Sequence, residues 1–255
     1  MDVDDDRLER EREFHDARFA EDSQGRSADR FYAVNAASDR WYRAEIDRAP
    51  AGAKVLDYGC GEGAFCALHA AHKGYDVVAI DISPVAIDHA REQAEREGVA
   101  ERIDFRVMNA EEMDLPAASF DVVSGLGVLH HLDIDGSMRA IARVMKPGGY
   151  GVFVEPLGHN PVINMYRRRT PEQRSVDEHP LLTSDFQTMR RHFGQLDTSY
   201  FHLLGLMAMP LNGRPSFDRA LRALDAADRA LFRAVKPMRR HAWMVGLRLA
   251  HPLQG

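Results

Sequence analysis

The sequence predicts an α/β fold built on a doubly wound, Rossmann-like sheet. From residue 53 onward, short apolar segments alternate with amphipathic ones, a spacing typical of βαβ units whose sheet is covered on both faces. A glycine-rich segment follows the first apolar segment, where a strand must turn sharply into a helix. The 255 residues include only two cysteines, which excludes a disulfide framework and a four-cysteine zinc site.

The expected elements follow in chain order. Residues 1–6 are expected to be frayed, and 7–47 to form two helices separated near Gly25 and Ser27. Strands are expected at 54–57, 76–81, 103–108, 120–124 and 150–155. The helices expected between them are 64–73, 84–97 and 136–145. Beyond these lie a loop or short helices at 156–180, a helix from 183–185 to 192, strands at 196–204 and 242–249, and an amphipathic helix at 216–235.

The domain division expected from this pattern is an N-terminal helical cap, 1–48, and a core, 49–255. Insertions on the acceptor side are expected at about 156–195 and 205–240. No apolar segment approaches the roughly 20 residues of a membrane span, and the acidic start is unlike a signal peptide, so we expect a cytoplasmic protein. The net charge of −6 argues against nucleic-acid partners. Because HExxH, facial-triad and CxxC spacings are missing from the sequence, no metal is expected.

The glycine segment, Gly59-Cys60-Gly61-Glu62-Gly63, has two interpretations. With Ala64 included, the segment reads Gly-x-Gly-x-x-Ala, a pattern that a dinucleotide-binding fold allows. A tight structural turn would also explain the glycines. Asp81 ends the second expected strand, where a carboxylate can accept both hydroxyls of a ribose, although it could instead cap the next helix. Together these features favour an adenosine-containing ligand of either kind.

Further motifs distinguish between a dinucleotide and another adenosine-containing ligand. Asp57 lies two positions before the first glycine, inside an apolar strand, where it can order the loop or reach an ammonium group. The motifs that follow are Asn109-Ala110-Glu111, residues 115–123, Leu129-His130-His131-Leu132 and Met145-Lys146-Pro147-Gly148-Gly149. In this order they resemble the class I S-adenosylmethionine-dependent methyltransferases, especially small-molecule members such as the ubiquinone/menaquinone C-methyltransferases. The resemblance covers about residues 50–156.

The resemblance implies a seven-stranded sheet in the order 3-2-1-4-5-7-6, with the last strand antiparallel, and S-adenosyl-L-methionine as the cofactor. Asp57 and the Gly59–Gly63 loop would face the methionine part, and Asp81 the ribose hydroxyls. Asn109 and Ala110 would flank the adenine, although the family usually has an acidic residue at the position of Asn109. The cofactor-binding residues expected in full are Asp57, Gly59, Cys60, Gly61, Gly63, Asp81, Ile82, Asn109, Ala110, Gly125, Leu126 and, from a helical lid, Tyr32.

Candidate catalytic groups lie at the ends of two strands. His130 follows the fourth strand and Glu155 closes the fifth; either could serve proton transfer, or pack and cap structurally. The polar segment 155–180 is either a solvated loop or an acceptor pocket. As a pocket it would supply a base from Glu155, Tyr166, Glu178 or His179, while His159, Arg167 and Arg174 would bind the acceptor, the arginines by holding an anionic group.

The predicted function is methyl transfer by direct displacement to a natural-product-like or quinone-like small molecule, with or without a carboxylate or phosphate. One alternative is a nucleic-acid or protein methyltransferase, but Ser124-Gly125-Leu126-Gly127 lacks the Asn/Asp-Pro-Pro-aromatic signature of resembling base-amine methyltransferases. Another is a non-catalytic cofactor-binding module, or a methyltransferase fold that binds nicotinamide. The sequence leaves monomer and homodimer open.

Overall fold

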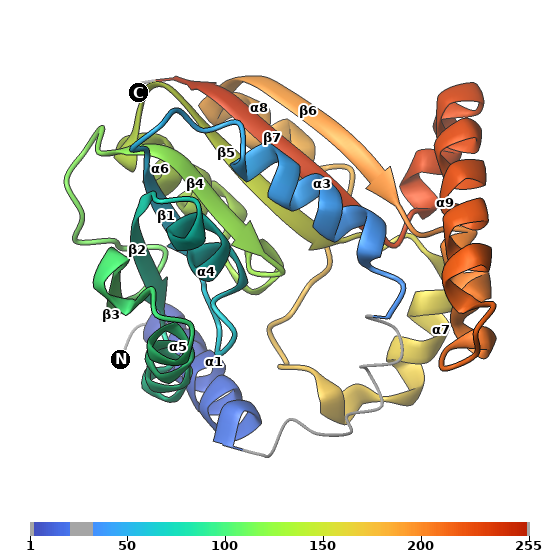
Figure 1. Cartoon of the computed structure of the whole chain (residues 1–255), viewed down its shortest axis with the longest axis horizontal. Coiled ribbons are helices and arrows are strands. Elements are labelled where there is room, and N and C mark those ends of the chain that lie inside the picture. Colours follow the sequence, from blue (N-terminus) through green and yellow to red (C-terminus); the bar gives the residue numbers. More distant parts are fainter. Residues whose placement is uncertain (1–2, 21–32, 254–255) are drawn as a thin grey trace.

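The computed structural model describes residues 3–20 and 33–253, with seven strands in one sheet. The strand order is β3-β2-β1-β4-β5-β7-β6 (Figure 1). Strands β1 to β5 pair in parallel, and β7 runs antiparallel to both β5 and β6. This arrangement confirms the expected fold class.

The strands match the expected segments closely. They are β1 Lys54–Tyr58, β2 Asp76–Asp81, β3 Ile103–Val107, β4 Phe120–Leu126, β5 Met145–Pro156, β6 Phe193–Phe201 and β7 Met244–Pro252. The largest difference is β5, which begins five residues earlier than expected because Met145 pairs with Phe120 before the register shifts. Neighbouring strand residues alternate between two buried clusters, with Val55 in one and Leu56 in the other, so the sheet has a core on each face.

Helices cover both faces of this sheet. They are α1 Val3–Ala20, α3 Ala36–Ile46, α4 Phe65–His72, α5 Pro84–Arg96, α6 Ile134–Val144, α7 Pro161–Arg169, α8 Asp185–His192 and α9 Phe217–Ala234. Short 3-10 helices are η1 Ala100–Arg102, η2 Leu129–His131, η3 Pro171–Gln173, η4 Gly205–Leu211 and η5 Lys236–His241. Helices α3, α4 and α5 contribute to one core cluster, and α6 and α8 to the other. Within the described part of the chain, no helix is both long and apolar enough to cross a membrane.

The two N-terminal helices have different positions. Helix α1 begins at Val3, so the expectation of fraying over 1–6 is wrong for the described part, and α1 packs against α5 (Figure 1). Helix α3 lies on the sheet, where Tyr42 and Ile46 are buried. The expected break near Gly25 and Ser27 lies outside the described residues. The domain boundary at 48 stays a prediction.

The strand order reverses between β1 and β4. Their carboxyl ends point the same way, and open α/β sheets bind ligands in the crevice outside such a switch point. The glycine loop after β1 and the segment 127–132 after β4 border this crevice.

Candidate functional site

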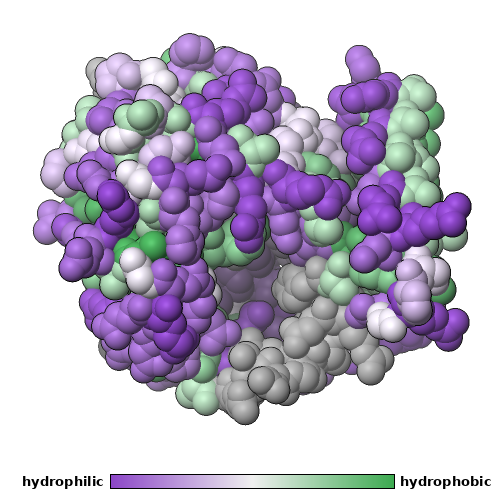
Figure 2. Space-filling view, in the orientation of Figure 1, coloured by the Kyte–Doolittle hydropathy of each residue, from purple (hydrophilic) through white to green (hydrophobic). Residues whose placement is uncertain are grey.

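A cavity of about 440 Å³ lies at the carboxyl ends of the strands. Helix α1 covers one side of it, and α7 with η3 borders another; Figure 2 shows this face of the molecule hollowed at its centre. The residues lining it are Arg7, Leu8, Glu11, His15, Arg18, Phe19, Asn35, Gly59, Cys60, Gly61, Asp81, Ile82, Asn109, Ala110, Leu126, Gly127, Val128, His130, His131, Leu132, Pro156, Ile163, Tyr166, Arg167, Gln173, Arg174, Glu178, Trp243 and Met244.

The glycine loop packs tightly against the segment after β4. Gly59 has a φ of +73°, and a Cβ at this position would run into the Val128 side chain. The amides of Gly59 and Cys60 both donate to the Ile80 carbonyl at 2.9 Å. These two amides therefore hold β1 to β2. Gly59, Cys60 and Gly61 line the cavity, whereas Gly63 lies outside it.

Asp81 lies at the centre of the expected ribose position. Its Oδ2 accepts the Gly61 amide at 2.8 Å, and its Oδ1 accepts the Ser83 amide at 2.9 Å. Burial raises the pKa of this carboxyl, although hydrogen bonds from the backbone amides of Ser83, Gly61 and Ile82 lower it. Ser83 caps α5 by accepting the Ala86 amide, so the capping function falls to Ser83 while Asp81 faces the cavity. Each Asp81 oxygen keeps a lone pair for a further donor.

Asp57 is not in the cavity. Its side chain is buried, and Oδ2 accepts the amide of Ala67 at 2.9 Å, which anchors the first turn of α4 below the glycine loop. Burial raises the pKa of Asp57 to about 7. Two residues at the end of β4 were expected to line the cofactor. Leu126 lines the cavity, whereas Gly125 packs between strands, where a Cβ would lie 2.8 Å from the Tyr58 carbonyl oxygen.

The end of β3 completes the cofactor side. Asn109 and Ala110 both line the cavity, as does Ile82 after β2. The Asn109 side-chain oxygen accepts the Glu111 amide at 3.0 Å, and the Tyr58 hydroxyl donates to the Ala110 carbonyl at 2.9 Å. Tyr32, also expected to bind cofactor, lies outside the described residues.

Glu155 and His130 form a buried pair at the end of β4 and β5. Glu155 is fully buried, and its Oε1 accepts the amides of Val128 at 3.0 Å and Leu129 at 2.9 Å. Its Oε2 lies 2.7 Å from His130 Nδ1. Because an ionised carboxylate only accepts hydrogen bonds, Nδ1 carries the proton and donates it, which leaves Nε2 with the ring's lone pair. His130 lines the cavity and Glu155 does not.

The segment after β5 brings some of its candidates to the cavity. Tyr166, Arg167, Arg174 and Glu178 line it. Arg167 donates to Glu178 at 2.6 Å; although burial alone would raise the pKa of Glu178, His130 and Arg167 lower it. The Arg174 guanidinium donates to the carbonyls of Arg167 and Thr170, so it satisfies the last turn of α7.

Two residues of this segment that were expected at the site lie outside the cavity lining. His159 lies outside the cavity lining, with Nε2 accepting the Thr183 amide at 3.4 Å. His179 also lies outside it, and its backbone amide donates to the His130 carbonyl at 2.8 Å. The Tyr166 hydroxyl donates to Gln173 at 2.8 Å. The segment thus folds as an ordered wall of the cavity, with short helices in place of a solvated loop.

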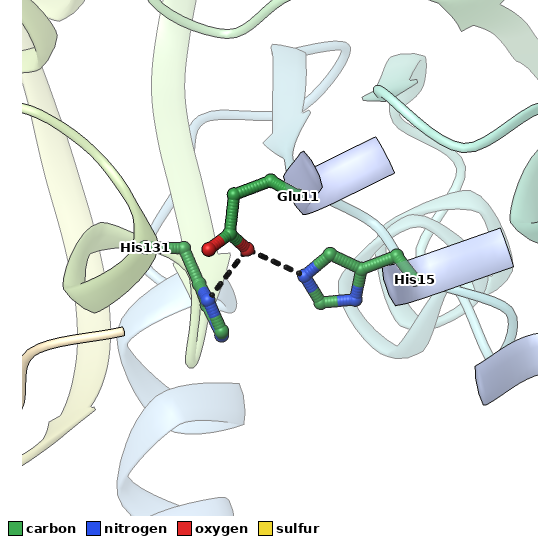
Figure 3. Close-up of side chains that lie close together, drawn as sticks. All are labelled: Glu11, His15 and His131. Atoms are coloured by element: carbon green, nitrogen blue, oxygen red, sulfur yellow. Dashed lines mark hydrogen bonds and ion pairs between the residues drawn. The ribbon is translucent and has the colours of Figure 1, made fainter. Parts of the chain in front are cut away.

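Helix α1 contributes residues that the sequence analysis did not select. Glu11 Oε2 lies 3.1 Å from His131 Nδ1 and 3.5 Å from His15 Nε2 (Figure 3). Burial is the main cause that lowers the pKa of His131 to about 4, with a smaller contribution from His130 when it is protonated, so the His131 ring is neutral near pH 7. Burial would raise the pKa of Glu11, but hydrogen bonds from His131, His15 and Ser175 lower it below its usual range. The spacing of four between Glu11 and His15 places both on one helix face, but nothing local connects them to His131.

The comparisons with known proteins agree with this geometry. Residues 56–153 match a family described as a methyltransferase domain. The ubiquinone biosynthesis O-methyltransferase of Xanthomonas axonopodis pv. citri is 39% identical over 114 residues, covering 44% of this chain and 46% of that protein. Residues 56–153 are therefore similar to a methyltransferase domain, in agreement with the expected resemblance.

Solved structures share the fold of this domain. Geranyl diphosphate C-methyltransferase from Streptomyces coelicolor A3(2), in complex with Mg²⁺, geranyl diphosphate and S-adenosyl-L-homocysteine, matches with a TM-score of 0.62 at 12% identity, covering 91% of this chain and 86% of that one. The [4+2]-cyclase SpnF matches with a TM-score of 0.57 at 21% identity, covering 85% of this chain and 82% of that one. At these identities the likeness shows the fold alone. The chain spans less than half the length of the curated relative named above.

Proposed function

We propose that this protein transfers the methyl group of S-adenosylmethionine to an oxygen of a small, largely apolar acceptor. The observation that carries the proposal is the Glu155–His130 pair. His130 of this pair lines the same cavity as Asp81 and the glycine loop, so a proton acceptor and a cofactor site share one enclosed space.

The cofactor side of the cavity fits an adenosyl group. Asp81 retains acceptor capacity for two ribose hydroxyls, Asn109 and Ala110 border the adenine position, and Gly59 permits close approach at the switch point. When bound, the cofactor supplies an activated methyl group on a sulfonium. The protein's contribution is to orient the acceptor and remove its proton.

His130 is the residue best placed to remove that proton. Glu155 holds Nδ1 as the donor, so Nε2 can accept a proton, and the resulting imidazolium is stabilised by the buried carboxylate. A hydroxyl acceptor needs this assistance, whereas a neutral amine does not. The similarity to a ubiquinone biosynthesis O-methyltransferase supports the same assignment.

The acceptor side is apolar with a few charged groups. An apolar wall on this side suits an acceptor with a ring or a hydrocarbon body. It consists of Leu8, Leu132, Ile163, Trp243 and Met244. The Arg167 side chain is paired with Glu178, and the Arg174 side chain is hydrogen-bonded to carbonyls at the end of α7. An anionic group on the acceptor would have to compete with these partners. We therefore favour a phenolic or enolic hydroxyl over a carboxylate or phosphate.

The test uses paired acceptor panels. Phenols and catechols are incubated with protein and S-adenosylmethionine beside the matching anilines, and products are analysed by mass spectrometry. Methylation of hydroxyl compounds alone is expected. Methylation of the anilines alone would refute the oxygen assignment, and binding of S-adenosylhomocysteine without turnover of any compound would support a non-catalytic or cyclase-like function.

Four further expectations remain part of the proposal. A small-molecule partner and no nucleic acid are expected, and a salt-sensitive gel shift with RNA or DNA would contradict this. A cytoplasmic location and a monomeric or homodimeric state stay predictions.

A further inference from the structure

A cluster of metal-ligating side chains lies on the wall of the cavity. Glu11, His15 and His131 each direct one nitrogen or oxygen atom toward the same point, and all three atoms lie within 4.8 Å of one another (Figure 3). The three side chains are 5%, 18% and 11% exposed, respectively. Two come from helix α1, and the third from η2 after β4.

The two separations that involve Glu11 fit coordination to one ion, and the two imidazole nitrogens lie within 4.8 Å of each other. Bonds of about 2.1 Å place ligand atoms about 3.0 Å apart in an octahedron and about 3.4 Å apart in a tetrahedron. The Glu11 Oε2 atom lies 3.1 Å from His131 Nδ1 and 3.5 Å from His15 Nε2. Little movement is therefore needed for an ion to replace the proton that Glu11 and His131 share.

Neighbouring side chains already orient these groups. The Ser175 hydroxyl donates to Glu11 Oε1, which leaves Oε2 directed at the two imidazoles. The Arg7 guanidinium donates to the His131 carbonyl at 3.3 Å and pairs with Glu111 at 2.6 Å. A neighbouring group, His130, His131 and Glu178, is less suited, since His130 is held by Glu155 and Glu178 by Arg167.

We propose that Glu11, His15 and His131 bind a divalent first-row transition ion, with Zn²⁺ as the best fit. Two imidazoles and one carboxylate form a donor set that suits Zn²⁺, Co²⁺ or Fe²⁺, whereas Mg²⁺ prefers oxygen ligands alone. Three protein ligands leave at least one coordination position, and all three residues line the cavity. An oxygen atom of the methyl acceptor would occupy that position. This occupancy rests on the proposed function, whereas the ion site itself does not depend on it.

The ion would also connect two parts of the chain. Glu11 and His131 are 120 positions apart, and the coordination joins α1 to the loop that carries His130. Binding of the ion should therefore stabilise α1 over the cavity.

The experiment titrates chelator-treated protein with Zn²⁺ by calorimetry and with Co²⁺ by visible absorption, in the absence of cofactor. One ion per chain is expected, with d–d bands for bound Co²⁺. Glu11→Gln, His15→Ala and His131→Ala should each weaken binding at least about 100-fold, because loss of an outer-shell partner alone costs 10–100-fold. Amide exchange in α1 should slow when Zn²⁺ is added.

A matched control separates this site from surface binding. His89→Ala removes a histidine on α5 whose Nδ1 lies 3.5 Å from a carboxylate oxygen of Glu62, and it should leave ion affinity unchanged. Circular dichroism and thermal melting show that each variant is folded, and calorimetry with S-adenosylhomocysteine tests the cofactor site separately. Absence of saturable binding, or equal loss in His89→Ala, would overturn the proposal and leave the cluster as a hydrogen-bonded contact of α1.

Discussion

The Glu155–His130 pair gives the sharpest mutational prediction, which is the substitution Glu155→Gln. The amide preserves the size of the side chain, and its carbonyl oxygen can still accept the amides of Val128 and Leu129, as Oε1 does now. Its NH2 group then faces His130 Nδ1, where Oε2 accepts at 2.7 Å. Two donors cannot share this hydrogen bond, so the His130 proton moves to Nε2, which then becomes a donor and can no longer accept a proton.

The magnitude follows from the function lost. A general base contributes about 10²–10⁴-fold to the rate, so kcat/KM for a hydroxyl acceptor should fall by this factor. The fold should survive, since one perturbed hydrogen bond at a buried site costs about 1–3 kcal/mol. Affinity for S-adenosylhomocysteine should change less than about 3-fold, because Glu155 does not line the cavity.

Two measurements check this prediction. Single-turnover methyl transfer to a phenol identified by the acceptor panel gives the rate, and ¹⁵N NMR of labelled histidine gives the tautomer of His130. The reasoning would be refuted if Glu155→Gln shifted the tautomer without slowing transfer, or slowed transfer with the tautomer unchanged. His179→Gln, at a histidine outside the cavity lining, is the control and should alter neither.

Other predictions concern the loop, the strand below it and the wall of the cavity. The Asp57 carboxyl has a pKa of about 7 in the folded protein and about 3.9 in the unfolded chain, so the folded state holds the proton more tightly. Protonated Asp57 therefore contributes stability that is fully present below about pH 4. This contribution is lost as the pH rises through about 7. Urea unfolding across this range should show up to about 4 kcal/mol of loss that Asp57→Asn abolishes, and an unchanged slope in the variant would contradict the assignment. Gly59→Ala should destabilise the protein by about 1–3 kcal/mol, whereas Gly63→Ala, where a Cβ meets nothing within 4 Å, should cost little in the same thermal melt. Arg174→Met should cost about 1–2 kcal/mol and speed amide exchange at the end of α7, unlike Arg168→Met at an exposed position; equal effects of the two would argue against the capping function.

The core of the fold was predictable because its signals are local. The glycine loop, the Asp at the end of β2 and the alternation of apolar segments each depend on residues close in sequence, and the helix expected at 216–235 agrees with α9 within one residue at each end. The start of β5 was predicted wrongly because Met145 pairs across the sheet with Phe120, a contact that the local pattern does not reveal.

The site was only partly predictable for the same reason. Asp57 was expected to reach either the loop or a ligand, and its hydrogen bond to the Ala67 amide favours ordering of the structure below the loop. Glu155 was considered as a base, yet its contacts make it a positioning residue for His130. Glu11 and His15 were not selected, since only the folding of α1 over the cavity brings them to His131.

Calorimetric titration with S-adenosyl-L-homocysteine, comparing the wild-type protein with Asp81→Asn, addresses the adenosyl site most directly. Hydrogen bonds to charged groups contribute about 1.5–3 kcal/mol, so affinity should fall at least about 10-fold. Asp76→Asn, at the opposite end of the same strand, should bind as tightly as the wild type. Equal affinities for all three proteins would contradict the placement of the ribose at Asp81, and with it the cofactor orientation proposed for the cavity.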